Sequence, residues 1–237
     1  MTLQLAMMTG GIWMKSVIFD LDGTLADTSG DLIAAANVCF RDMGYGDVLQ
    51  ASQDAAVALR GGRRMLVEGL TRKGHPDPEP VIKKYYPVLL EAYDQAIDHH
   101  TFLFPGAMQA VETLKSQGYA VGICTNKPEA LAEKLMQSLG ARAAFDSLVG
   151  ADTLPVRKPD PAPLFEAAKR AGGDPQNCLL IGDSDTDRNT ATAAHVPCIL
   201  VGFGPSGEDM AALNPDALIE SFENLPGAVR RLMPLGV

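Results

Sequence analysis

Short apolar runs recur along the chain, and each ends in small or polar residues. Buried strands are typically runs of this length and composition. Helical spacing of apolar residues marks 106–117, 128–139 and 161–171, so strand and helix alternate from residue 105 onward. This alternation predicts an α/β fold: a doubly wound parallel sheet, Rossmann-like, with helices on both faces. The apolar runs are SVIFD (16–20), YAVGICT (119–125), SLVGAD (147–152), CLLIGD (178–183) and PCILVGF (197–203).

The interval from about residue 30 to residue 100 breaks this alternation. It contains no convincing strand, and glycine and proline clusters divide it into four helix-like segments, 29–43, 52–59, 63–73 and 78–97. We therefore expect a helical cap at 29–100 inserted in a core formed by 14–28 and 101–237. Residues 1–13 are expected to form an N-terminal extension.

Composition narrows the class of protein. The 237 residues are 46% hydrophobic, enough to bury a substantial core. A net charge of −9 gives no broad positive field for nucleic acid or anionic lipid. No stretch approaches the roughly 18 apolar residues of a membrane span, and the start lacks the basic region of a signal peptide. Four scattered cysteines without a CxxC pair indicate free thiols. We expect a cytoplasmic enzyme, monomeric or homodimeric.

The residues at the ends of the expected strands are chemically coherent. Taken singly, they are ordinary turn and cap residues, but ligands bind at the carboxyl ends of parallel strands, where all of them would meet. Their charges are also complementary, which favours a functional site over a set of unrelated turns. In chain order they are Asp20, Asp22, Gly23 and Thr24, then Thr125 and Asn126, then Lys158, and finally Asp183, Asp185 and Asp187.

This set of residue types suits phosphoryl transfer. Several carboxylates at one sheet edge would repel one another without a hard cation, and Mg²⁺ prefers oxygen ligands. Lys158 and the Thr125 hydroxyl can hold phosphoryl oxygens as charge builds. Gly23 lets the backbone turn sharply and approach a phosphate. Asp20 and Asp22 share a side in extended chain, so one can attack phosphorus while the other exchanges protons with the leaving oxygen and with water.

Four segments resemble, in order, the four motifs of the haloacid dehalogenase superfamily. The closest resemblance is to its phosphoglycolate phosphatase subfamily, and it spans about residues 15–205. It implies an α/β core with a helical cap inserted after the first motif. The four segments are DLDGTLADT (20–28), CTNKP (124–128), RKPDPAPL (157–164) and GDSDTD (182–187).

The resemblance also implies a role for each motif residue. Asp20 would be the nucleophile that forms an aspartyl-phosphate, and Asp22 the general acid and base. Mg²⁺ would be held by the Asp20 carboxylate, the Asp22 backbone carbonyl and Asp183, with Asp187 in support. In the cap, Arg63 follows a glycine pair and is the candidate to bind a substrate carboxylate. The implied phosphate-binding residues are Gly23, Thr24, Thr125, Asn126 and Lys158.

The activity implied is that of a phosphoric monoester hydrolase acting on a small phosphorylated metabolite, with 2-phosphoglycolate as the favoured substrate. Asp22 argues against dehalogenation, because dehalogenases of the superfamily lack an aspartate at that position. A sugar-phosphate phosphatase and a hexose-phosphate mutase stay open as alternatives. A phospho-accepting receiver domain is disfavoured, since it predicts about half this length and an acceptor on a middle strand.

The chain departs from the family pattern at one turn. His195 stands where the family has a glycine after the helix of the fourth motif. Histidine tolerates left-handed backbone better than bulky apolar residues, so we expect the turn to be kept.

Overall fold

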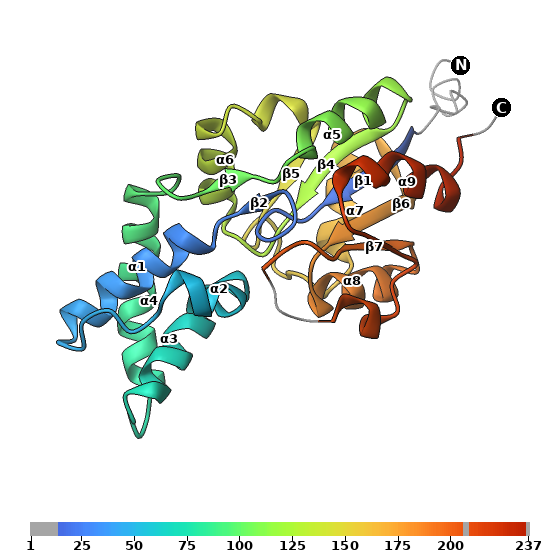
Figure 1. The fold of residues 1–237 in the computed structure, drawn as a ribbon. Coiled ribbons are helices and arrows are strands. Elements are labelled where there is room, and N and C mark those ends of the chain that lie inside the picture. Colours follow the sequence, from blue (N-terminus) through green and yellow to red (C-terminus); the bar gives the residue numbers. More distant parts are fainter. Residues whose placement is uncertain (1–13, 206–208, 236–237) are drawn as a thin grey trace, which may run out of the picture.

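The computed structural model describes residues 14–205 and 209–235; the expected N-terminal extension lies outside them. One parallel sheet with the order β5-β4-β1-β6-β7-β8 forms the centre (Figure 1). The prediction of a parallel α/β sheet is confirmed, and β8 is an addition that the sequence patterns did not indicate. The strands are β1 (Met14–Phe19), β4 (Ala120–Cys124), β5 (Ser147–Val149), β6 (Gly173–Gly182), β7 (Cys198–Val201) and β8 (Ala217–Ile219).

Helices cover both faces of this sheet. In β1, Val17 and Phe19 point into one hydrophobic cluster and Ile18 into the other, as the two-residue period of a strand requires. The first cluster includes residues of α5 (Ala107–Ser116), α6 (Glu129–Ser138) and α9 (Leu225–Leu232). The second includes residues of α7 (Ala162–Arg170) and α8 (Asp185–Ala194). Both sides of the strands are therefore buried, which explains their continuous apolar runs.

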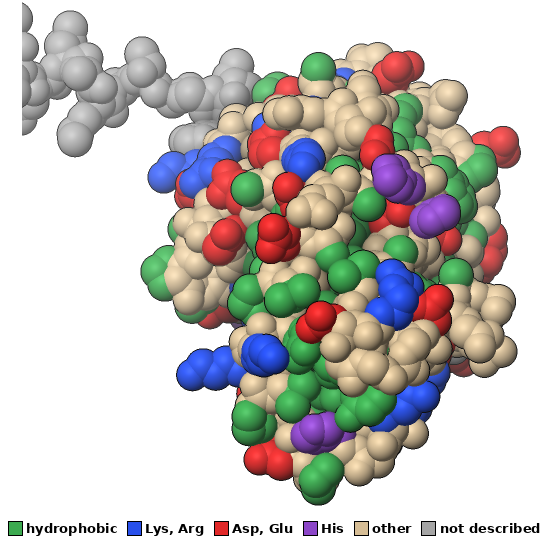
Figure 2. Space-filling model, turned by 90° about the vertical axis from the view of Figure 1, so that its left-hand side faces the viewer, with side chains coloured by type: hydrophobic (Ala, Val, Ile, Leu, Met, Phe, Trp, Pro, Cys, Tyr) green, Lys and Arg blue, Asp and Glu red, His purple; other side chains and the backbone are tan. Residues whose placement is uncertain are grey.

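Four helices within residues 29–95 form the cap, which projects to one side of the sheet (Figure 1). Figure 2 looks at this end of the molecule, where acidic and basic side chains are interspersed. The ring of Phe40 packs so closely on α3 that a Cβ at Gly69 would lie 2.1 Å from its Cζ atom. The helices are α1 (Ser29–Asp42), α2 (Ala51–Leu59), α3 (Gly62–Arg72) and α4 (Glu79–Gln95).

The chain crosses between core and cap through a two-stranded antiparallel ribbon. Strand β2 (Ala26–Asp27) pairs with β3 (Phe102–Leu103). Nearby, the buried Asp31 carboxylate of α1 accepts hydrogen bonds from the Thr101 amide at 2.9 Å and the Thr101 hydroxyl at 2.7 Å. The outgoing and returning segments are thereby held side by side.

Three short 3₁₀ helices lie at Arg142–Ala144, Met210–Leu213 and Phe222–Asn224. None of the helices in the described part of the chain has the length and hydropathy that a membrane crossing requires. All four cysteines are free, as the sequence predicted, and all four are buried. The turn at His195 is kept, with a left-handed φ of 56°.

Candidate active site

Three carboxylates meet at the carboxyl end of β1 and β6. These strands are paired, and the amide of Asp20 donates to the Ile181 carbonyl at 2.8 Å, so Asp20 comes to lie beside Asp183. Asp187 joins them from the first turn of α8. One oxygen from each of the three side chains lies within 4.8 Å of the others. The two sequence motifs that contain these residues thus form one acidic cluster.

The fold holds Asp187 by a reciprocal cap at the start of α8. The Ser184 hydroxyl donates to Oδ2 of Asp187 at 2.6 Å, and the Ser184 oxygen accepts from the Asp187 amide. The Asp183 amide also donates to that Oδ2, at 3.3 Å. A serine cap followed three residues later by an acid is the local pattern that places this carboxylate.

Lys158 is the cation of the cluster. Its Nζ atom lies 2.6 Å from Oδ1 of Asp187 and 3.0 Å from Oδ1 of Asp20, and the side chain is buried. Burial alone would lower the pKa of this amine, but the charges of Asp187 and Asp20 raise it, so Lys158 stays protonated. The Asn126 side chain donates to the Lys158 carbonyl at 3.0 Å, so Asn126 supports the loop that carries the lysine.

The turn after β1 fits tightly against Asp183. Gly23 has a φ of +82°, and a Cβ at this position would lie 2.2 Å from Oδ2 of Asp183. The hydroxyl of Thr24 donates to the other oxygen of Asp183 at 2.9 Å. In this structure Thr24 therefore orients an acidic side chain, a contact that the implied phosphate-binding role did not include.

Thr125 lies at the end of β4, the neighbour of β1 in the sheet. Its side chain is buried, and its oxygen accepts a hydrogen bond from the Lys127 amide at 3.2 Å. No acceptor for the Thr125 hydroxyl proton is found among the described residues, which leaves that proton to donate to a ligand.

Asp22 has two donors on the same oxygen. The Thr28 hydroxyl and the Nζ atom of Lys127 each lie 2.7 Å from its Oδ1 atom. Sequence reasoning did not assign a role to Lys127. The available signals were its position after the Thr125 and Asn126 pair and its place inside the CTNKP segment, but a lysine in a loop is more often exposed.

Burial and mutual repulsion raise the pKa values of two carboxylic acids of the cluster. Burial, partly offset by Lys158, raises the pKa of Asp20 from 3.8 to about 6, and the charges of Asp187 and Asp22 add to the rise. Burial also raises the pKa of Asp183 well above its ordinary value, with Asp187 and Asp20 contributing. Once ionised, three carboxylates with one lysine among them carry an excess of negative charge, and a divalent cation would offset it.

The cap reaches this site through the end of α2. The Leu59 side chain lies over Gly23, and its Cδ1 atom would be 3.0 Å from a Cβ placed there. Arg63 points elsewhere: its two terminal nitrogens donate to the Glu79 carboxylate at 3.0 and 2.6 Å, and its side chain is 57% exposed. The structure does not bring Arg63 to the acidic cluster.

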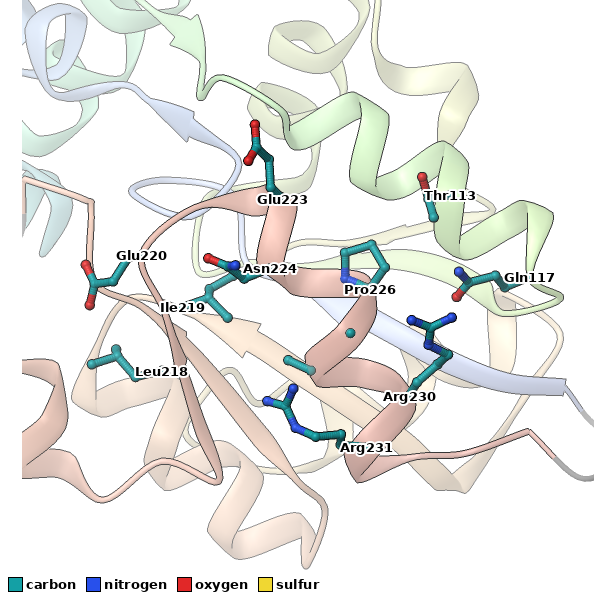
Figure 3. Close-up of a pocket in the computed structure, with 12 residues that line it drawn as sticks. Thr113, Gln117, Leu218, Ile219, Glu220, Glu223, Asn224, Pro226, Arg230 and Arg231 are labelled. Carbon is teal, nitrogen blue, oxygen red and sulfur yellow. The ribbon is translucent and has the colours of Figure 1, made fainter.

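A separate hollow of about 650 Å³ lies between α5, β8 and α9 (Figure 3). Its rim carries both signs of charge, with Glu220 and Glu223 on one side and Arg230 and Arg231 on the other. None of the candidate residues is among those that line it in the described chain. The candidate active site at the strand ends is therefore separate from this hollow.

Comparison with known proteins agrees with the fold. The family model described as haloacid dehalogenase-like hydrolase matches residues 17–201. A phosphoglycolate phosphatase of Mesorhizobium japonicum is 34% identical over 217 residues, covering 88% of this chain and 92% of that protein. One from Agrobacterium fabrum is 33% identical over 220 residues, covering 92% of this chain and 94% of that protein.

A solved structure with the same fold is described as a predicted phosphoglycolate phosphatase from Haemophilus somnus 129pt. It aligns with a TM-score of 0.79 at 24% identity, covering 90% of this chain and 97% of that one. The chain belongs to the haloacid dehalogenase-like hydrolase family. It is a hydrolase, and the family resemblance drawn from its four motifs is confirmed.

Proposed function

We propose that this chain is a Mg²⁺-dependent phosphatase that hydrolyses a small phosphate monoester through an aspartyl-phosphate on Asp20. The observation that carries the proposal is the cluster of the half-buried Asp20 and the buried Asp183 and Asp187 around Lys158. The first three supply oxygen ligands for a hard cation, and the lysine supplies a fixed positive charge beside the nucleophile.

Mg²⁺ suits the donors present. All three carboxylates offer oxygen, and burial, with the charges of neighbouring carboxylates, raises the pKa values of Asp20 and Asp183, so a bound cation would favour their ionised forms. The Asp20 and Asp183 carboxylates and the Asp22 carbonyl would hold the ion, with Asp187 close by. When bound, the ion offsets the repulsion between an anionic nucleophile and an anionic phosphate.

The side chains then divide the chemistry among them. Asp20 attacks phosphorus, and Lys158 and the Thr125 hydroxyl bind the phosphoryl oxygens. Asp22 protonates the oxygen of the departing alcohol and later removes a proton from the water that hydrolyses the aspartyl-phosphate. Leu59 of the cap covers Gly23 beside the cluster, where it would help exclude bulk water during transfer.

We further propose 2-phosphoglycolate as the substrate and the cytoplasm as the location. The names of the Mesorhizobium and Agrobacterium relatives, which align over most of both chains, support the substrate. The four free, buried thiols are compatible with a reducing compartment. A sugar-phosphate phosphatase and a hexose-phosphate mutase are the alternatives within the family.

A panel of phosphate esters tests the proposal. We expect release of inorganic phosphate from 2-phosphoglycolate with a higher kcat/KM than from hexose phosphates or p-nitrophenyl phosphate, and loss of all three activities in a chelator. A mutase would convert a hexose phosphate without releasing phosphate. No phosphate release from any ester with Mg²⁺ present would refute the phosphatase assignment.

Melting of the protein with and without Mg²⁺ provides a readout that does not depend on turnover. An ion at 100 times its dissociation constant stabilises a folded protein by about 2.7 kcal/mol. For a chain of this size, that corresponds to a rise in Tm of roughly 5–10 °C. Asp183→Asn should reduce this rise, because it removes one ionised ligand.

A further inference from the structure

Lys127 connects the cap to Asp22. Its Nζ atom lies 2.7 Å from Oδ1 of Asp22, and only 4% of the lysine side chain is exposed. The same ammonium lies over the ring of Tyr93, from cap helix α4, with Nζ 4.4 Å from the ring centroid. Tyr93 is itself 1% exposed. A buried cation thus stands between a cap aromatic ring and the proposed acid and base.

Burial of the Lys127 ammonium carries a desolvation cost, which its contacts with Asp22 and Tyr93 must offset. Burying an ammonium group removes its hydration, and the cost is recovered only when a counter-charge and an aromatic face replace the water. Asp22 and Tyr93 provide both. By contrast Lys134, which also reaches from the core to the cap by pairing with Asp94, is 48% exposed.

The two oxygens of Asp22 are not equivalent. Oδ1 accepts hydrogen bonds from both Lys127 and Thr28. Because two donors already point at its lone pairs, a proton on Oδ1 would clash with them. No hydrogen bond to Oδ2 is found among the described residues. Oδ2 is therefore the atom from which a proton can be passed to a substrate.

We infer that Lys127 is a positioning residue: it holds Oδ1 of Asp22 so that Oδ2 faces the leaving oxygen of the ester, and Tyr93 of the cap holds Lys127. The inference rests on the proposed phosphatase function. As Asp20 forms its bond to phosphorus, the bond from phosphorus to the ester oxygen breaks. The electron pair of that bond stays on the ester oxygen, which takes the proton from Oδ2. Asp22 is left as a carboxylate beside the Lys127 ammonium.

Leaving-group dependence distinguishes this role from a structural one. An alkoxide leaves only with a proton, so an alkyl phosphate needs a well-placed acid, whereas p-nitrophenolate is stable enough to leave without one. The ratio kcat/KM reports events up to the first irreversible step, which is the transfer to Asp20. Loss of Lys127 should therefore affect alkyl esters far more than the aryl ester.

The experiment compares wild type, Lys127→Met and the control Lys134→Met on three substrates: 2-phosphoglycolate, glycerol phosphate and p-nitrophenyl phosphate. In Lys127→Met we expect kcat/KM to fall on the order of 100-fold for both alkyl esters and less than about 5-fold for the aryl ester. Lys134→Met should behave as wild type on all three substrates, because its exposed pair lies away from Asp22.

Each other outcome has a distinct meaning. An equal fall on all three esters would overturn the inference and leave Lys127 a structural residue. A fall confined to 2-phosphoglycolate would also overturn it, because Lys127 would then bind the substrate carboxylate. If wild type released no phosphate from any ester, the proposed function itself would fail. Should Lys127→Met not fold, Tyr93→Leu, which keeps the lysine, must shift the alkyl-to-aryl ratio in the same direction for the inference to stand.

Discussion

The Nζ atom of Lys158 lies 2.6 Å from Oδ1 of Asp187, and the two side chains are 1% and 0% exposed. Removing the ammonium would leave buried carboxylates without a counter-charge. In a chelator, we expect Lys158→Met to lower the free energy of unfolding by about 3–5 kcal/mol. Mg²⁺ should restore part of the loss.

Urea unfolding with and without Mg²⁺ measures both effects. Lys134→Met is the matched control, because its pair with Asp94 is 48% and 46% exposed and should contribute about 0–1 kcal/mol. Equal losses of unfolding free energy in the two variants would mean that breaking the buried pair costs no more than breaking the exposed pair.

The nucleophile assignment predicts the behaviour of Asp20→Asn. The amide cannot attack phosphorus, so we expect phosphatase activity below about 10⁻³ of the wild-type rate, with the fold retained. Asp185→Asn provides a control in the same region, since Asp185 is exposed at the start of α8. Phosphate release measures the loss of activity, and thermal melting measures whether the fold is retained. Activity near wild type in Asp20→Asn would exclude Asp20 as nucleophile.

The raised pKa of Asp20 predicts a pH effect on stability. In the metal-free protein this pKa is about 6, against an ordinary value of 3.8. Between these values the folded protein keeps a proton that the unfolded chain has released, so this group destabilises wild type as pH rises. Asparagine carries no such charge. The stability of Asp20→Asn relative to wild type should therefore grow by on the order of 3 kcal/mol from pH 4 to pH 7.

Urea unfolding in a chelator across this pH range measures the difference. Mg²⁺ should flatten the trend, because the ion compensates the Asp20 carboxylate. A difference that is constant or that shrinks with rising pH would contradict the origin assigned to the pKa shift.

The contacts of Arg63 predict a small effect on substrate binding. Its guanidinium is paired with Glu79 on the cap surface. We expect Arg63→Ala to change KM for 2-phosphoglycolate by less than about 2-fold, because the side chain does not lie at the cluster, and to leave stability almost unchanged. Steady-state kinetics on 2-phosphoglycolate and p-nitrophenyl phosphate measure the change in KM for each ester. A rise in KM for the carboxylated ester alone would restore the specificity role that the sequence suggested.

The strand ends show what a sequence of this kind can predict. Asp20 and Asp183 follow continuous apolar runs, and such runs mark buried parallel strands whose ends share one edge of the sheet. Local pattern was therefore enough to bring these side chains together. Strand β8 was missed because Ala217–Ile219 is a short run between polar residues, two positions after Pro215.

Side-chain partners were harder to predict, because they depend on packing between distant segments. Thr24 contacts Asp183 across 159 positions, and Lys127 contacts Asp22 across 105. No local pattern reports such pairings. Arg63 was placed in the site from its position after a glycine pair, but Glu79, sixteen residues further on, determines where its side chain lies.

The ribbon of β2 and β3 has a consequence for how enzymes of this kind diversify. Because Ala26 and Leu103 lie opposite each other, the segment between them enters and leaves the core at one point. Recombination can exchange such a segment as a cassette without severing any strand of the central sheet. A chimaera joined at these two positions would keep every strand of the central sheet, with Asp20 at the end of β1, and would exchange α1 to α4 as one unit.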